Sequence, residues 1–260
     1  MISCFLQGGL GNQLFQIATT VSFALDNDIE PVFNLSTHYL PLQGNRAIKY
    51  KDNLYHNLKL IDVSEYNKFN IYTEPKFSYN IIPDQLKQGN YILKGFFQSE
   101  KYFLHNRNKI IDLFNPKEIL NNQLIKYTPL LDGNTCSIHI RRGDYIKFPN
   151  EHPILKIDYY EKAMKGIGMD VKFLIFSDDI LWCKNNLKGD NLFFIDDHDY
   201  VSLCLMSLCE NNIIANSSFS WWGAWLNENK NKKVIAPKSW FGKNKNLNIK
   251  DIIPDTWIKI

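Results

Sequence analysis

The sequence predicts an α/β protein with parallel sheets, divided into two βαβ lobes. Short apolar runs alternate with helical patterns along the 260 residues, and this alternation is typical of βαβ units. Glycines follow soon after the first apolar run, at the point where a strand would turn into a helix. The composition changes near 127–134, which contains Thr128-Pro129 and Asp132-Gly133. We therefore predict an N-terminal lobe over 1–130, a C-terminal lobe over 131–260 and a cleft between them.

Each element is predicted from its periodicity. Apolar residues recur at helical spacing from Leu14 to Leu25. A second helix is expected from about Ser99 to Asn115, because the residue before a proline avoids the helical region. Residues 36–90 are polar and rich in Tyr and Asn, and support no assignment. Buried strands are predicted at Ile2–Leu6, Pro31–Leu35, Tyr91–Phe97, Thr135–Ile140, Val171–Phe176, Leu192–Ile195, Ile213–Ala215 and Val234–Ala236.

Composition excludes several classes of protein. Hydrophobic residues make up 45% and charged residues 22%, which are globular values and exclude a disordered or coiled-coil chain. The net charge of +3 is too small to indicate a nucleic-acid partner, and the lysines of the C-terminal stretch are interpreted as a solvated face. This small net charge is still compatible with a local cluster of basic residues that binds a small anion.

Nothing in the sequence predicts a membrane span, a signal peptide or a metal centre. Asn and Ser interrupt the longest uncharged stretch, Asn211–Asn227, and no basic n-region precedes an apolar run at Met1. The five cysteines form no CxxC pair, so we expect reduced, mostly buried thiols and no zinc site. We expect a cytoplasmic protein, with peripheral membrane contact left open.

Four unusual segments follow predicted strands, where open α/β sheets bind their ligands. The first is the glycine loop Gly8–Gln13, whose glycines allow a close approach of backbone to ligand before a helix N-terminus. Its spacing fits neither a dinucleotide fingerprint nor a P-loop, and a tight turn alone would use the same glycines. The other three segments are His139–Asp144, Ser177–Asp179 and Asn216–Ser220.

The arginine pair at the end of the strand Thr135–Ile140 is the sharpest of these signals. Guanidinium groups bind phosphate oxygens in a bidentate manner and stay charged. Side chains alternate along an extended segment, so His139 and Arg141 face one way and Arg142 faces the other. One arginine is therefore expected to enter the cleft while the other supports the loop. Asp144 is expected to pair with either one, and a purely structural Arg–Asp bridge is the alternative.

The serine and aspartate segments each have two interpretations. Ser217 and Ser218 precede an expected helix, where hydroxyl and N–H groups suit a phosphate but also serve as ordinary caps. The tryptophans that follow are expected to pack in the core. Asp178-Asp179 and Asp197-His198-Asp199 resemble carboxylate pairs for a divalent ion. We favour helix caps, since two arginines would already neutralise a diphosphate.

Three of these segments together resemble the motifs of the α-1,2-fucosyltransferases, glycosyltransferase family 11. The matching residues are Gly8-Gly9-Leu10-Gly11-Asn12-Gln13-Leu14-Phe15-Gln16, His139-Ile140-Arg141-Arg142-Gly143-Asp144-Tyr145 and Ile213-Ile214-Ala215-Asn216-Ser217-Ser218-Phe219-Ser220-Trp221-Trp222-Gly223-Ala224. Their order and spacing match over about residues 1–240.

The resemblance implies a GT-B-like fold of two Rossmann-like lobes and inverting, metal-independent transfer of L-fucose to the 2-hydroxyl of galactose. The donor would be GDP-β-L-fucose, used as a substrate with no cofactor, and the acceptor a galactose-terminated oligosaccharide or lipid-linked glycan. His139 would lie by the guanine and Arg141 would hold the diphosphate. By the same resemblance, Ser217, Ser218 and Phe219 would line the phosphates, and Gly9, Gly11 and Asn12 would face them from the N-terminal lobe. Arg142, Ser177 and Asp178, which follow predicted strands, are further candidates for donor binding.

One departure from the family pattern concerns the guanine amino group. Similar sequences often carry an Asp where this chain has Ser202, and Asp199, one turn earlier, is the expected substitute. The catalytic candidates are Arg141, Asn12 and Asp144, although a carboxylate in an ion pair is a weak base. The alternatives are a GDP-sugar transferase of another linkage or sugar and a non-catalytic module that binds sugar nucleotides.

Overall fold

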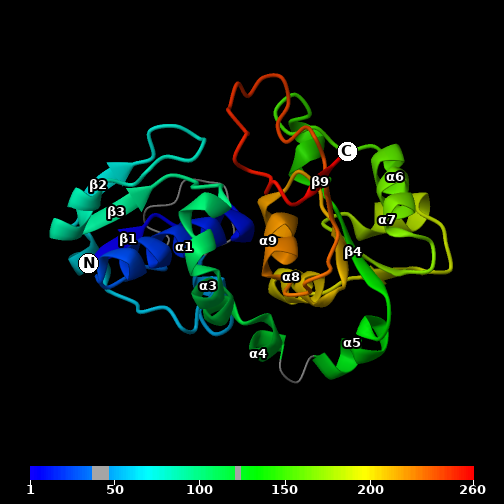
Figure 1. Ribbon diagram of the computed structural model, residues 1–260, viewed down its shortest axis with the longest axis horizontal. Helices are drawn as coiled ribbons and strands as arrows, with labels where there is room; N and C mark the ends of the chain where they lie inside the picture. Colours follow the sequence, from blue (N-terminus) through cyan, green and yellow to red (C-terminus); the bar gives the residue numbers. More distant parts are fainter. Residues whose placement is uncertain (37–46, 121–123) are drawn as a thin grey trace. The chain divides into compact units, whose positions relative to one another are not determined.

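The computed structural model describes residues 1–36, 47–120 and 124–260, and the chain divides into two compact units (Figure 1). The first unit contains Met1–Asn115 and Asn248–Pro254, and the second contains Pro116–Leu247 and Asp255–Ile260. The chain therefore passes between the units at Asn115, at Leu247 and again at Pro254.

The division between the units falls earlier than the predicted boundary at residue 130. Helices α4 (Pro116–Leu120) and α5 (Leu124–Leu131) belong to the second unit. Lys126 at the start of α5 donates to Asp197 at 3.1 Å, and Lys172 donates to the carbonyls of Pro129 and Asp132. These contacts hold α5 to the second unit, so the polar turn that the sequence marks as a boundary lies inside it.

The first unit is built on a small parallel sheet. Its strand order is β1-β3-β2, and both pairings are parallel. The strands are β1 (Ile2–Cys4), β2 (Asn70–Thr73) and β3 (Tyr91–Lys94), and the helices are α1 (Leu10–Asn27), α2 (Val63–Tyr66) and α3 (Arg107–Phe114). Pro31 and Phe33 form single bridges to Ile2 and Leu60 in place of the predicted strand.

A segment from near the C-terminus completes the first unit. Within Asn248–Pro254, the Asp251 side chain is only 4% exposed. One of its carboxylate oxygens accepts the backbone N–H of Tyr79 at 3.1 Å, and the other accepts from Lys101 Nζ at 2.5 Å. Burial alone would raise the pKa of this carboxyl, but these two hydrogen bonds hold it below its ordinary value. We call Asn248–Pro254 the strap.

The second unit contains a six-stranded parallel sheet of order β6-β5-β4-β7-β8-β9. Its strands are β4 (Thr135–Ile140), β5 (Lys172–Ser177), β6 (Leu192–Ile195), β7 (Asn211–Ile213), β8 (Val234–Ala236) and β9 (Ile258–Lys259). The chain builds outward from β4 to β6 on one side and then from β7 to β9 on the other. The strand order therefore reverses between β4 and β7, and such a switch point is where doubly wound sheets bind ligands.

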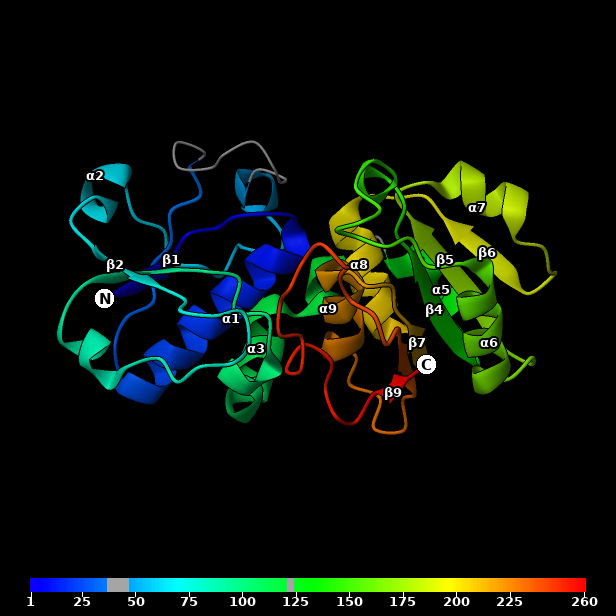
Figure 2. The same ribbon diagram turned by 90° about the horizontal axis from the view of Figure 1, so that it is seen from above.

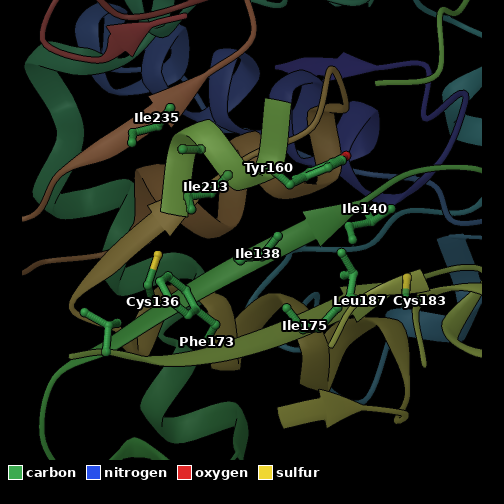
Figure 3. Close-up of a cluster of buried hydrophobic side chains, with 12 residues drawn as sticks. Cys136, Ile138, Ile140, Tyr160, Phe173, Ile175, Cys183, Leu187, Ile213 and Ile235 are labelled. Atoms are coloured by element: carbon green, nitrogen blue, oxygen red, sulfur yellow. The ribbon is translucent and has the colours of Figure 1, made fainter. Parts of the chain in front are cut away.

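Helices cover both faces of this sheet (Figures 1 and 2). One face carries α6 (Ile157–Ile167) and α7 (Ile180–Asn186), and the other carries α8 (Asp199–Leu208) and α9 (Ser218–Leu226). Alternate residues of β4 serve the two faces, as its extended backbone requires. Figure 3 shows Cys136, Ile138 and Ile140 in the core cluster with Tyr160 and Cys183. On the opposite face Ser137 accepts from Asn212, which also donates to the Met206 carbonyl of α8.

Buried tryptophans anchor α9. Trp221, Trp222 and Trp225 are at most 1% exposed, and Trp257 lies 5.5 Å from Trp221 between ring centroids. Full burial of a large apolar side chain contributes about 1.5–3 kcal/mol. The prediction that Trp221, Trp222 and Trp225 pack in the core is confirmed.

The five cysteines are buried and form no disulfide, as predicted. Burial raises the pKa of the Cys4 and Cys209 thiols to about 12, so both stay protonated at neutral pH. Within the described ranges, no helix combines the length and the hydrophobicity needed to cross a membrane.

Candidate functional site

Three of the four predicted strand-end segments meet in the second unit, at the switch point. The backbone N–H of Arg142 donates to Asp178 at 2.9 Å, which joins the loop after β4 to the loop after β5. The hydroxyl of Tyr145 donates to the Asn216 carbonyl at 3.0 Å, which joins the loop after β4 to the loop after β7. Parallel strands explain this convergence, since their carboxyl ends lie at one edge of the sheet. The fourth segment, the glycine loop, belongs to the first unit.

Arg141 lies directly after β4 and is held by two carboxylates. Its Nη2 donates to Asp144 at 2.6 Å, and its Nη1 lies 3.0 Å from an Asp178 oxygen. The guanidinium carbon is 5.2 Å from the centroid of the Tyr145 ring. Its Nε is buried and has no hydrogen-bond partner among the described residues. The guanidinium is therefore fixed in place, and its buried Nε–H is an unused donor.

Arg142 faces the opposite way and is held by α7. Its Nε donates to Asp179 at 3.1 Å, and its guanidinium lies 3.7 Å from the centroid of the Trp182 ring. Asp179 also caps α7, because its side chain accepts the backbone N–H of Trp182. Ser177 accepts the backbone N–H of Asp179 at 2.9 Å. The cap interpretation of Asp179 is confirmed, and Arg142 supports the loop as the alternation along the strand predicts.

The two guanidiniums and their three carboxylates leave this cluster with one net negative charge. Asp144 is the most exposed of the three carboxylates, at 61%, whereas Asp178 is 26% exposed. Asp178 also receives the Arg142 N–H, so it is bound from two sides. An anion that approaches Arg141 would therefore displace Asp144 more easily than Asp178, because an exposed ion pair is weak.

His139 is buried beside the start of α9. It is 3% exposed, and its ring centroid lies 5.3 Å from that of Phe219. Burial, with the nearby Arg141 charge, lowers the pKa of His139 to about 3, so the imidazole is neutral at physiological pH. Its Nδ1 is buried without a hydrogen-bond partner in the described part of the chain. A buried polar atom left unpaired costs about 1–3 kcal/mol, so this site fits a ligand that supplies the missing bond.

The start of α9 lies against His139 and is capped by Ser217. The Ser217 hydroxyl accepts the backbone N–H of Phe219 at 3.4 Å, so the capping interpretation is confirmed. Ser218 and Phe219, in the first turn, are only partly buried. A helix N-terminus carries partial positive charge, which favours an anion near these residues.

Asp199 begins α8, where its carboxylate accepts the backbone N–H of Tyr200 at 2.9 Å. Ser202, one turn further on, is buried at 8% exposure. That Asp199 takes over guanine recognition from the Ser202 position stays a prediction. In the described ranges, no three His, Cys, Asp or Glu side chains are grouped so that they could hold a metal ion.

The glycine loop of the first unit is tightly fixed. Gly8 has a positive φ of 76°, and a Cβ there would lie 2.3 Å from the side chain of Asn12. Gly9 precedes α1, and its missing Cβ would meet no atom within 4 Å. Gly11 is buried inside the helix. Asn12 accepts from Gln98 at 2.7 Å, so its amide orientation is set by the loop after β3.

Two buried glutamines, to which the sequence analysis gave no role, hold this loop. Gln16 donates to the carbonyls of Gln7 and Gly95 at 3.3 and 3.1 Å, and Gln13 donates to the Gly8 carbonyl at 3.0 Å. Gln13 in turn accepts from the Tyr55 hydroxyl at 2.9 Å. The sequence does carry a signal for this role. Gln13 and Gln16 interrupt the apolar face of the predicted helix, and buried amides must find hydrogen-bond partners.

Asn216 and Tyr145 are also structural members of the site that the sequence analysis left without a role. Asn216 is buried and donates to the carbonyls of Pro153 and Trp240 at 3.0 and 3.1 Å. The Asn216 carbonyl also accepts from the Tyr145 hydroxyl. Asn216 therefore joins the loops after β4, β7 and β8 at one edge of the sheet.

Replacement of Gly143 tests how closely the loop after β4 packs. A Cβ at Gly143 would lie 2.3 Å from an Asp178 carboxylate oxygen, so Gly143→Ala must push away the group that holds Arg141 and the Arg142 N–H. We expect a loss of about 1–3 kcal/mol in the free energy of unfolding, the usual cost of overpacking. Urea denaturation measures it.

The matched control for that variant is Gly166→Ala, whose Cβ would make an ordinary 3.4 Å contact with Ile235. Because alanine is the better helix former, this control should not destabilise the protein. An unchanged unfolding midpoint for Gly143→Ala would show that Asp178 is not tightly placed.

Comparison with known proteins gives matches over the whole chain. The model of the family described as glycosyl transferase family 11 matches residues 1–260. The Escherichia coli O-antigen biosynthesis glycosyltransferase WbnK is 33% identical, with 100% of each chain covered. An Escherichia coli alpha-1,2-colitosyltransferase is 30% identical, with 98% of this chain and 97% of the relative covered. A Caenorhabditis elegans galactoside 2-alpha-L-fucosyltransferase is 24% identical, with 100% of this chain and 79% of the relative covered.

Solved structures show the fold. Fucosyltransferase NodZ from Bradyrhizobium matches with a TM-score of 0.52 at 14% identity, over 85% of this chain and 91% of that one. Arabidopsis thaliana FUT1 matches with a TM-score of 0.50 at 12% identity, over 90% of this chain and 69% of that one. These neighbours have the GT-B fold, so the predicted α/β GT-B-like fold class is confirmed.

Proposed function

Because the chain belongs to glycosyltransferase family 11, we propose that it transfers L-fucose from GDP-β-L-fucose to the 2-hydroxyl of a terminal galactose, with inversion at the anomeric carbon. The acceptor is a galactose-terminated oligosaccharide or a lipid-linked glycan. The 2-linkage is supported by the names of two relatives, the alpha-1,2-colitosyltransferase and the galactoside 2-alpha-L-fucosyltransferase.

The observation that carries the proposal is the pair of unused buried polar atoms at the end of β4. Arg141 Nε and His139 Nδ1 both lack a partner among the described residues, and they lie two residues apart on one side of the chain. A nucleoside diphosphate offers complementary groups, since phosphate oxygens accept from a guanidinium and a base can bond with a neutral imidazole. His139 would then contact the guanine while Arg141 contacts the diphosphate.

The chemistry of the transfer explains why a fixed cation is useful there. Loss of GDP from the sugar passes through an oxocarbenium-like state while negative charge grows on the departing β-phosphate. Donors that already point at that charge need no reorganisation during the reaction, which makes them effective catalysts. Arg141 would supply this group, and the first turn of α9 at Ser217, Ser218 and Phe219 would add N–H donors. The donor contacts predicted for Gly9, Gly11 and Asn12 stay a prediction.

Asp144 tests whether the exposed ion pair competes with the ligand. Removal of its charge by Asp144→Asn should free Arg141 Nη2 and tighten GDP binding by up to about fivefold, because exposed ion pairs contribute about 0.2–1 kcal/mol. Isothermal titration calorimetry with GDP measures the affinity. The turnover number should change by less than about threefold if the attacking hydroxyl needs little assistance. A fall of about 100-fold or more would instead identify Asp144 as the general base.

A second candidate donor is a nucleotide-activated colitose. The relative named as a colitosyltransferase is 30% identical, whereas the fucosyltransferase from Caenorhabditis elegans is 24% identical. The decisive experiment incubates the protein in EDTA with GDP-fucose, GDP-colitose or GDP-mannose and a panel of galactose-terminated oligosaccharides. NMR then identifies the transferred sugar and its linkage. Product with GDP-fucose and an α-1,2 linkage supports the proposal, and GDP binding with no product from any donor would leave a non-catalytic module.

A further inference from the structure

A patch that is both basic and apolar lies on the second unit, beside the strand-end site. Two loops form it, one after β4 and one after β8 (Figure 1). The backbone N–H groups of Gly242 and Asn244 donate to the carbonyls of Glu151 and Asn150 at 2.9 and 3.2 Å, so the loops are in direct contact. We define the surface patch as Ile146, Lys147, Phe148, Lys243, Lys245 and Leu247.

The apolar members of the surface patch are held in exposed positions. Ile146, Phe148 and Leu247 are 50%, 48% and 40% exposed. The N–H of Ile146 donates to the Arg142 carbonyl at 3.0 Å, and that of Phe148 donates to the Tyr145 carbonyl at 3.1 Å. Tyr145 itself is buried and stacks on His152 at 4.6 Å. These hydrogen bonds fix the backbone of Ile146 and Phe148, so the fold of the loop itself holds their side chains in solvent.

The charged members of the surface patch come from a stretch rich in lysine. Between Glu228 and Asp251 the chain carries no acidic residue, and it carries Lys230, Lys232, Lys233, Lys238, Lys243, Lys245 and Lys250. Lys147 and Lys243 are exposed. Lys245 lies 2.9 Å from His152 Nε2 and 4.0 Å from Glu151, so part of its charge is engaged. Asp144, two residues before Ile146, is paired with Arg141.

We propose that the surface patch docks the protein on a bilayer that contains anionic phospholipid. Lysines attract the negative headgroups while apolar side chains enter the interface, which is the chemistry of peripheral membrane contact. A nucleic acid would use the lysines but offers no partner for the aliphatic Ile146 and Leu247. The inference goes beyond the proposed transfer reaction and does not depend on it. If the chain both transfers the sugar and docks in this way, the loop that carries Arg141 also contacts the membrane, where a lipid-linked acceptor would be present.

Vesicle co-sedimentation of the full chain tests the docking. The chain should bind vesicles of mixed phosphatidylglycerol and phosphatidylcholine at low salt, bind phosphatidylcholine vesicles weakly, and dissociate at high salt as surface charges are screened. The double variant Lys147→Gln/Lys243→Gln should weaken binding about tenfold or more, since each lysine near an anionic surface contributes about fivefold. Ile146→Ser/Phe148→Ser should weaken binding at low salt as well.

Matched controls separate the surface patch from general charge and stickiness. Lys162→Gln/Lys165→Gln removes two exposed lysines of α6, and Ile125→Ser/Met169→Ser removes two side chains that are 76% and 65% exposed. Both controls should bind vesicles like the unaltered chain. Equal loss in controls and patch variants, or no binding of the unaltered chain to anionic vesicles, would overturn the proposal. Tight binding to a single-stranded oligonucleotide without vesicle binding would do the same. GDP affinity of the patch variants in solution should be unchanged, which keeps this test independent of the donor site.

Discussion

Replacement of Arg141 by alanine should reduce kcat/KM for transfer by about 10²–10⁴-fold, or roughly 3–5 kcal/mol of transition-state stabilisation. The guanidinium is fixed by Asp144 and Asp178 and keeps a buried Nε donor free of partners among the described residues. Its loss removes a charged donor from the position where charge grows on the departing phosphate. Initial rates of GDP release with a soluble acceptor measure the effect.

Two further variants show whether charge or shape is responsible. Arg141→Lys keeps the cation but loses the planar fork, so it should recover only part of the lost rate. Lys147→Ala removes an exposed cation close by and should leave the rate with a soluble acceptor unchanged. Thermal melting of each variant checks folding, because Arg141→Ala leaves two carboxylates without their cation. A folded Arg141→Ala protein that turns over within threefold of the unaltered chain would refute the role of Arg141.

Replacement of Asp251 should destabilise the first unit. Its side chain is 4% exposed and accepts from Lys101 and from the Tyr79 N–H, so Asp251→Ala leaves both donors without their partner. Hydrogen bonds to a charged group contribute about 1.5–3 kcal/mol, and Lys101 is half exposed and regains water. We expect a loss of about 2 kcal/mol in the free energy of unfolding at pH 7, measured by urea denaturation.

The pH dependence of that loss has a definite sign. The folded protein holds the pKa of Asp251 below its ordinary value, so the stabilisation is present above the unfolded pKa of about 3.9. It is lost as the pH falls through the lower, folded pKa. The difference in unfolding free energy between the unaltered chain and Asp251→Asn should therefore shrink below about pH 4.

The control is Asp255→Asn. Asp255 is 95% exposed and lies 3.8 Å from Lys259, so this change should alter the free energy of unfolding by less than about 0.5 kcal/mol. Equal effects at both positions would show that the strap is not anchored by Asp251.

Periodicity and turn chemistry predict the second unit well and the first unit poorly. The bounds of β4, β6 and β8 agree with the sequence prediction, because each is a short, largely apolar run. β4 and β8 are fully buried, and β6, at the edge of the sheet, is mostly half-buried. By contrast β2 (Asn70–Thr73) is mostly exposed and has no apolar run, so periodicity could not find it. The predicted helix from Ser99 begins as short 3₁₀ turns and becomes α-helical only at Arg107. Residues 37–46 of the stretch that supported no assignment lie outside the described residues.

The candidate site was predictable where side chains alternate along a strand. His139 contacts α9 and Arg142 contacts α7, as the two-residue period requires. What periodicity could not give is the identity of the partners, because these come from distant loops. Arg141 is held by Asp178 as well as by Asp144. Asn216 donates to the carbonyls of Pro153 and Trp240, which are distant from it in the sequence. Such contacts depend on the strand order, which no local pattern encodes.

The strap has a practical consequence for anyone who wishes to study the halves in isolation. A gene fragment that ends at Asn115 omits Asn248–Pro254, and with it the carboxylate that Lys101 and Tyr79 need. A fragment that runs from Pro116 to Ile260 carries that heptapeptide without the residues of the first unit that bind it. Independent expression of the first half therefore calls for a circularly permuted or grafted design that appends the missing peptide through a short artificial linker.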